Sequence, residues 1–87
     1  MISHTTTDFW SCYEKLPSHL RLLARKQYRL WKLNPRHPSV EFKKIGPRCW
    51  SSRINDGWRA IATPIPGGYL WIWIGSHDEY LRRIRAR

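Results

Sequence analysis

The sequence is poor in cysteine and in acidic residues, and it contains no long apolar run. Its two cysteines, Cys12 and Cys49, are far apart and form no CxxC or CxxH pair, which argues against zinc fingers and small disulfide scaffolds. The histidines show no ligand spacing, so we expect no metal and no cofactor. The longest apolar run spans residues 69–74, whereas a membrane span needs about 20 apolar residues, so we expect no membrane partner.

The first residues, MISHTTTDFW, lack the basic segment and the apolar stretch of a secretory signal. We therefore expect a cytoplasmic protein whose two thiols stay reduced. The 87 residues contain no repeat, linker or low-complexity segment. This length and organisation predict a single domain over residues 1–87 with one modest core.

Positive charge is abundant. The chain has sixteen Lys and Arg and six Asp and Glu, for a net charge of +10. Eleven of the basic residues lie within positions 21–59. A field of this strength attracts phosphate polyanions or a strongly acidic protein. A basic surface without a specific partner is the alternative.

Two helices are predicted near the N-terminus. Thr7 is a good N-cap, and Asp8 follows in the first turn, where a carboxylate favours the positive end of the helix dipole. This short helix is interrupted at Pro17. A second helix begins at Ser18 and ends at Asn34, which precedes a proline. Its apolar face is predicted from residues spaced by threes and fours, namely Leu20, Leu23, Ala24, Tyr28 and Trp31.

A basic stripe follows the second helix beside its apolar face. Its members, at spacings of four, four and three, are Arg21, Arg25, Arg29 and Lys32. The stripe is either a solvated helix face or a docking surface for RNA phosphates or an acidic partner.

After Pro38 the pattern changes to that of strands, over residues 48–54, 58–63 and 69–74. Turn residues separate them at 55–57 and 66–68. The expected fold class is α+β, with two N-terminal helices packed on one face of a three- to four-stranded antiparallel sheet.

The first turn decides which residues share a face of the sheet. A two-residue turn pairs Ile54 with Arg59, which directs Arg53 and Arg59 to opposite sides. A three-residue turn with Gly57 in the left-handed conformation pairs Arg53 with Arg59. We favour the second register, because two neighbouring arginines on the open face are explained by a phosphate between them.

The tryptophans have two possible tasks. Trp10, Trp31, Trp50 and Trp58 are predicted to be core residues. Trp71 and Trp73 alternate with aliphatic residues, so they are expected to share one face of the last strand. On the open face they would stack on unpaired bases, and on the helix side they would be core.

Several motifs resemble those of one family of proteins. The frame reads FW…LP…A…Y.LW..NP.HPS..FK, then W.SRI..GWRAI, and closes with WIWIGSHDEY. From Phe9 to Tyr80 it resembles the RelE/ParE superfamily of bacterial type II toxins, in particular a short variant common among plasmid-stabilisation-like proteins. The most specific segments are residues 57–59 and 75–80.

The resemblance implies a RelE-like fold and a toxin that a small acidic antitoxin keeps silent. RelE-like members are mRNA endonucleases that act at the ribosome without a metal, through attack of the 2′-hydroxyl on the adjacent phosphate. Arg59 matches a position that contacts the scissile phosphate, and Arg53 matches a common basic position on the preceding strand. His77 matches a position that carries Arg or a catalytic His. Tyr80 is a looser match to the catalytic tyrosine. The basic residues Lys43, Lys44, Arg82 and Arg83 would bind nucleic acid.

Two other functions remain open at this point. ParE-like members share the fold, lack the nuclease residues and poison DNA gyrase, and a silent member would only bind its antitoxin. The pairing of His77 with Arg59 favours the nuclease. Trp50 and Ser52 stand where nucleases often carry lysine, which favours the others. For His77 and Tyr80 a purely structural role is the alternative. For Arg59 the alternative is an ion pair with Asp56 or Glu41.

Overall fold

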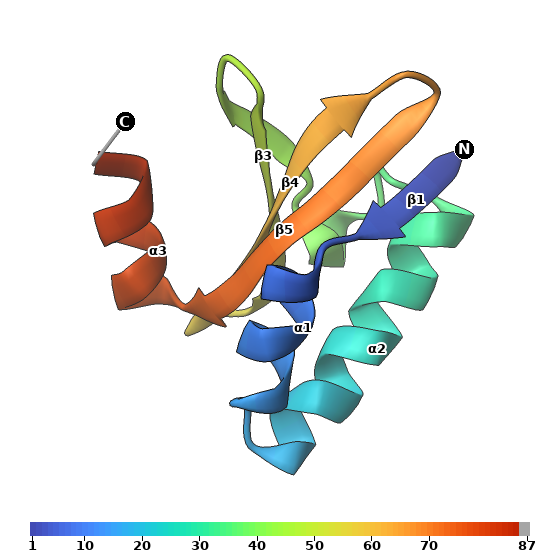
Figure 1. Ribbon diagram of the computed structural model, residues 1–87. Coiled ribbons are helices and arrows are strands. Elements are labelled where there is room, and N and C mark those ends of the chain that lie inside the picture. The colour runs from blue at the N-terminus through green and yellow to red at the C-terminus, as the bar shows by residue number, and fades with distance from the viewer. Residues whose placement is uncertain (86–87) are drawn as a thin grey trace.

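The fold is described from a computed structural model of the chain, covering residues 1–85. Three helices and five strands follow one another along the chain (Figure 1). In order they are β1 (Ile2–Thr5), α1 (Thr7–Glu14), α2 (Ser18–Leu33), the 3-10 turn η1 (Pro38–Val40), β2 (Lys43–Gly46), β3 (Cys49–Asn55), β4 (Trp58–Ile65), β5 (Gly68–Ser76) and α3 (His77–Arg85).

The strands form one sheet in the order β1-β5-β4-β3-β2. Strands β2 to β5 are antiparallel neighbours, while β1 is parallel to β5. The α+β class with two N-terminal helices on one face is confirmed, but the sheet has five strands and is mixed rather than antiparallel throughout. Residues 2–5 give little strand signal of their own and are held by pairing with the edge of β5.

Local hydrogen bonds and sequence signals determine where the two N-terminal helices begin and end. Thr6, one residue before the expected cap, accepts a hydrogen bond from the Phe9 amide (3.0 Å). Helix α2 runs up to Asn34, and it buries Leu20, Ala24 and Trp31 as their spacing predicts. Both helices lie on the same face of the sheet (Figure 1), so their apolar sides face the first core.

Helix α1 continues the edge that β1 begins. Strand β1 pairs only with residues 68–71 of β5, and the Thr6 amide donates to the Trp71 carbonyl (3.0 Å) before the chain turns into α1. In Figure 1 α1 follows β1 along the remaining part of β5. The same side of β5 is therefore covered first by a strand and then by a helix.

A β-bulge in β5 divides its tryptophans between the two faces. Ala62 pairs with Trp71, whereas the preceding Ile61 pairs with Trp73, so one residue of β5 is left over. Because Ala62 and Ile61 are consecutive on β4, their partners point to opposite faces. The prediction that Trp71 and Trp73 share a face is wrong for this reason.

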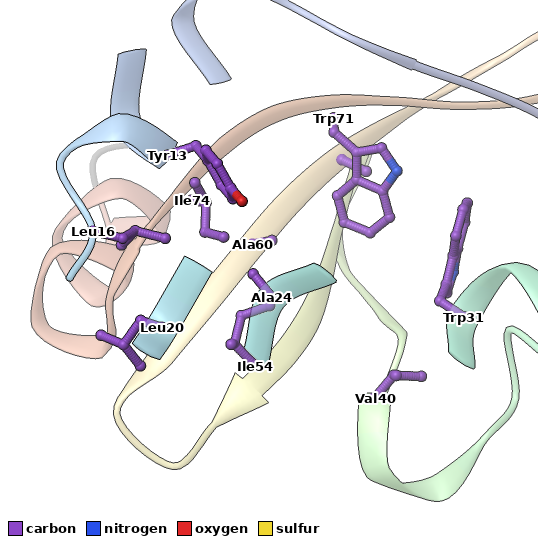
Figure 2. Close-up of a cluster of buried hydrophobic side chains, with 11 residues drawn as sticks. Tyr13, Leu16, Leu20, Ala24, Trp31, Val40, Ile54, Ala60, Trp71 and Ile74 are labelled. Carbon is purple, nitrogen blue, oxygen red and sulfur yellow. The ribbon is translucent and has the colours of Figure 1, made fainter. Parts of the chain in front are cut away.

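The sheet consequently has a core on each face. The first, under α1 and α2, contains Trp31 and Trp71 at 1% and 5% exposure (Figure 2). The second contains Trp73 and lies under α3. Its buried members are Cys49, Ile61, Trp73 and Tyr80, and Leu81 and Ile84 pack against them.

Helix α3 was not expected from the sequence. It begins at His77 and is capped by the preceding Ser76, whose Oγ accepts from the Glu79 amide (3.2 Å) and donates to the Glu79 carboxylate (3.1 Å). Ser and Glu at this spacing form the S-x-x-E pattern of a capping box, which is the signal in the sequence. Helix α3 covers part of the face that was expected to stay open.

The structure corrects three of the predicted core positions. Trp50 is half-buried and belongs to neither core cluster. Trp10 is 45% exposed, with its Nε1 donating to Thr5 Oγ1 (2.8 Å). Trp58 is half-buried and packs at the margin of the first core. Trp31 is buried as expected, and its ring lies 5.0 Å from that of Trp71 in an edge-on arrangement.

The structure also describes the cysteines, the lengths of the helices and the grouping of residues that could bind a metal. Both cysteines are free, Cys49 buried and Cys12 half-buried. No helix within residues 1–85 is long and apolar enough to cross a membrane. In the same part of the chain no three His, Cys, Asp or Glu residues lie together where they could hold a metal ion.

Gly68 provides a test of the β1–β5 pairing. A Cβ at Gly68 would lie 1.7 Å from the Ile2 carbonyl oxygen, whereas a Cβ at Gly46 would meet nothing closer than 3.7 Å. We predict that Gly68→Ala destabilises the fold by about 1–3 kcal/mol, as overpacking does, and that it exposes the β1 amides to hydrogen exchange. Gly46→Ala is the control. Unchanged exchange at residues 3–5 in Gly68→Ala would contradict this account.

Candidate active site

The β3–β4 hairpin places two arginines side by side. Its turn has two residues, Asp56 and Gly57, because Asn55 pairs with Trp58, and a bulge at Ile54 then brings Arg53 opposite Arg59. The expected pairing of the two arginines is confirmed. The expected cause is wrong, since Gly57 has no positive φ; the bulge supplies the additional residue.

The arginine pair lies on the face away from α2. Arg59 is followed by Ala60, which is buried in the first core under the helices. Because side chains alternate along a strand, Arg59 and its partner Arg53 point to the opposite face. Directly opposed side chains in an antiparallel pair have Cβ atoms about 4.5–5.5 Å apart. One phosphate can therefore reach both guanidinium groups.

Groups of the hairpin itself engage the two guanidinium groups. Arg53 Nη2 donates to Asp56 Oδ1 (2.6 Å), and Arg59 Nη1 donates to the carbonyls of Asn55 and Trp58. The hydrogen bond to Arg53 holds the pKa of Asp56 below its usual range, and it raises the pKa of Arg53 in turn. The site is thus a cationic pair with one exposed carboxylate beside it.

His77 is fixed close to the same hairpin. It is the first residue of α3, and its backbone N–H donates to the Gly57 carbonyl (2.8 Å). This bond joins the start of α3 to the turn that Arg53 and Arg59 flank. The half-buried imidazole lies 5.7 Å from the Tyr80 ring, centroid to centroid.

Tyr80 belongs mainly to the second core. Its side chain is only 6% exposed and packs with Cys49, Ile61 and Trp73. This burial agrees with a packing role, although on the face opposite α1 and α2. Tyr80 therefore holds α3, and with it His77, against the sheet.

The expected nucleic-acid-binding lysines point in different directions. Lys43 pairs with Ser51 and Lys44 pairs with Trp50. Ser51 shares its face with Arg53, two residues further along β3, whereas Trp50 stacks on Phe42 at the margin of the first core. Only Lys43 of this lysine pair therefore lies on the face of the arginines.

Residues of α3 and β5 complete that face. Arg83 covers Trp73, with its Cζ 5.1 Å from the ring centre, and Arg82 is exposed. Trp71 and Trp73 are 5% and 4% exposed, so neither ring offers a surface on which a base can stack. The basic side chains remain candidates for phosphate contacts.

The stripe on α2 is less uniform than its spacing suggests. Arg21 is half-buried and donates to the carbonyl of Leu16 (2.9 Å), at the link between α1 and α2. Arg25 Nε donates to the Tyr13 hydroxyl (2.7 Å), which raises the pKa of Arg25. Arg29 and Lys32 are exposed. Arg21 thus has a structural task, and the outer end of the stripe is accessible.

The alternative in which Arg59 forms an ion pair with Asp56 is wrong, because Asp56 has another partner. It pairs with Arg53, three residues earlier, and not with Arg59. Asn55 was not singled out; its Oδ1 accepts from the Gly57 amide (2.9 Å) and so shapes the turn. The signal for this local hydrogen bond is the Asn-Asp-Gly turn sequence itself.

The Arg53–Asp56 pair gives a pH-dependent prediction. Because the folded-state pKa of Asp56 is lowered, the pair stabilises the fold above the pKa of the unfolded chain, and the contribution is lost as pH falls through the lowered value. We predict that Arg53→Met moves the pKa of Asp56 back up toward its ordinary value, as measured by NMR titration of the carboxyl carbon. Asp8, distant along the chain, is the internal control. An unshifted Asp56 in Arg53→Met would contradict the pairing.

Comparisons with known proteins agree on the fold. No protein-family model and no curated sequence matches the chain. Among solved structures it is similar to the RelB-RelE antitoxin-toxin complex from Methanococcus jannaschii (TM-score 0.73, 10% identity, 92% of this chain and 96% of that one). It is also similar to a YoeB/ParE toxin from Agrobacterium tumefaciens (0.69, 19%, 88% and 99%). A third is the isolated E. coli RelE toxin (0.65, 20%, 95% and 97%). The chain therefore has the RelE-like fold that its motifs led us to expect.

Proposed function

We propose that the chain is the toxin of a type II toxin–antitoxin pair and that it cleaves mRNA at the ribosome. The observation that carries the proposal is the arrangement at the β3–β4 hairpin. Arg53 and Arg59 are opposed on one face of the sheet, and His77 is bonded through its backbone to the turn between them. Two phosphate ligands and one imidazole that can accept and donate a proton are the parts that such a reaction needs.

Each residue takes one role in the proposed reaction. The 2′-oxygen loses its proton and attacks the adjacent phosphorus, and the bond from phosphorus to the 5′-oxygen breaks as that oxygen gains a proton. His77 transfers one of these protons. Arg59 and Arg53 bind the phosphate and stabilise the charge that builds on it. Arg53 must exchange Asp56 for the phosphate to do so.

The structural neighbours support a toxin. They include a RelB-RelE antitoxin-toxin complex, a YoeB/ParE toxin and RelE itself. The nuclease is favoured over a gyrase poison because the arginine pair would have no evident use without a phosphate. The ribosome, the mRNA and the cytoplasm as the place of action are parts of the proposal.

The decisive variant is His77→Gln. We predict that it lowers the rate of mRNA cleavage about 10²–10⁴-fold, which is the usual contribution of a positioned proton-transfer group. Its binding to the ribosome should change little. His19→Gln, at an exposed position at the start of α2, is the matched control. The rates are measured in single-turnover cleavage of mRNA in the ribosomal A site, alongside growth arrest after induction.

Cells in which the chain is induced also distinguish the alternative functions. Rapid loss of translation with mRNA cut within codons identifies the nuclease. A DNA-damage response with translation intact identifies a gyrase poison. Full toxicity of His77→Gln, with no cleaved mRNA, would reject the proposed reaction.

We also propose that an acidic antitoxin binds the exposed end of the α2 stripe. The net charge of +10 and the exposure of Arg29 and Lys32 support an acidic partner. Two of the structural neighbours are complexes of RelE with the antitoxin RelB. We expect the antitoxin to be encoded by a reading frame next to that of this chain.

Charge reversal tests this surface. We predict that Arg29→Glu weakens antitoxin binding at least about tenfold and slows association most at low salt, because it sets like charges against each other. Lys26→Glu makes the same change of charge on an exposed turn of α2 outside the stripe, so it is the matched control. Binding is measured by surface plasmon resonance at two salt concentrations. Equal effects of the two variants would mean that net charge alone, and not the stripe, attracts the antitoxin.

A further inference from the structure

A cavity of about 510 Å³ lies between the two N-terminal helices and the sheet, on the face opposite the candidate active site. Figure 2 shows Tyr13 and Trp71 on either side of the small side chains of Ala24 and Ala60. These two alanines leave space that larger residues would fill. The volume is within the range of about 300–1,000 Å³ that is common for small-molecule sites.

Six aromatic side chains line this cavity. They belong to α1, α2 and β5, and they are Phe9, Trp10, Tyr13, Tyr28, Trp31 and Trp71. Rings of this kind favour a flat aromatic ligand, because offset and edge-on contacts between rings contribute beyond the area that they bury. The lining therefore favours an aromatic ligand.

Gln27 provides a polar group inside the cavity. It is 5% exposed, and its Nε2 donates to the carbonyls of Ser39 (3.0 Å) and Arg53 (3.3 Å). Its Oε1 accepts no hydrogen bond from any residue in the described part of the chain. The polar atoms that are sealed without a partner are Nε1 of Trp31 and Nε1 of Trp71, so the Gln27 oxygen is reached through the cavity. An accessible amide oxygen at this position can accept a hydrogen bond from a ligand N–H.

The charge at the cavity is positive. Arg25 lines it, and its Nε donates to the Tyr13 hydroxyl, so its terminal nitrogens are not used by this bond. His4 is another lining residue, and no Asp or Glu within residues 1–85 lines the cavity. An anionic group on the ligand would therefore be matched by Arg25.

We propose that this cavity binds a planar aromatic anion that carries a ring N–H. The ring system lies among the aromatic walls, the N–H donates to Gln27 Oε1, and the carboxylate accepts from Arg25. This site is independent of the proposed nuclease function, since it uses neither His77 nor the arginine pair.

Indole-3-acetate is the probe, because it has the flat ring, the N–H and the carboxylate. We expect saturable binding to the full chain by isothermal titration calorimetry, with NMR shifts at the indole N–H groups of Trp31 and Trp71. 1-Methylindole-3-acetate, which lacks the donor, should bind about fivefold more weakly. 3-Methylindole, which lacks the carboxylate, should bind about tenfold more weakly.

Two variants locate the site. Ala24→Leu fills the cavity and should abolish binding, and Arg25→Met should weaken binding of indole-3-acetate about tenfold while leaving 3-methylindole unaffected. Lys26→Met, on the adjacent exposed position, is the control for loss of charge. Thermal denaturation and the amide spectrum establish that each variant is folded.

Three results would overturn the proposal. They are no binding of any probe at millimolar concentration, undiminished binding by folded Ala24→Leu, and shifts confined to the β3–β4 hairpin, which would place the anion on the arginine pair. A cavity that rejects every probe but becomes protected when the antitoxin binds would instead be a protein interface. None of these outcomes depends on whether the chain cleaves RNA.

Discussion

The bulge in β5 is the constraint on which most of this structure depends. A regular strand would direct Trp71 and Trp73 to one face and leave the other face of β5 without a tryptophan. With the extra residue, Trp71 anchors the two N-terminal helices and Trp73 anchors α3. Gly75 belongs to the same device, because a Cβ there would lie 2.4 Å from the Trp73 ring. Since His77 follows directly after this strand, the position of the candidate proton-transfer group is set by how β5 packs on both faces.

The candidate site also illustrates how a cationic cluster can exist without its ligand. Opposed arginines repel each other, and the hairpin offsets this repulsion with groups of its own: the Asp56 carboxylate and the carbonyls of Asn55 and Trp58. The carboxylate is 98% exposed, so solvent screens the pair strongly and little free energy opposes its exchange for a phosphate. The backbone acceptors hold Arg59 more permanently. The two arginines are thus suited to different tasks, one fixed in place and one free to move toward a ligand.

Local patterns were sufficient to predict the two N-terminal helices and the antiparallel hairpins, but not α3. The pairing of Arg53 with Arg59 was predicted correctly but from the wrong turn. Helix periodicity over residues 18–33 and the turn sequence at residues 55–57 are short-range signals, and the structure agrees with both. Features that depend on distant partners were missed. Strand β1 acquires its conformation from β5, some 66 residues later, and the bulge at Ile72 has no sequence signature. The role of His77 was suggested by resemblance and stays a prediction, whereas the burial of Tyr80 became evident only when α3 was seen to cover the sheet.

The other border of the sheet has a consequence for how copies of the chain meet. Strand β2 spans four residues, its register shifts between Lys44 and Gly46, and its lysines are exposed. A short, bulged and charged border strand is a poor template for another strand, since pairing would bring lysines of two molecules together. The opposite border strand is β1, which also spans only four residues and is followed directly by α1. Short border strands limit edge-to-edge pairing between copies of the chain. A β-strand that joins β2 would have to bring acidic side chains with it.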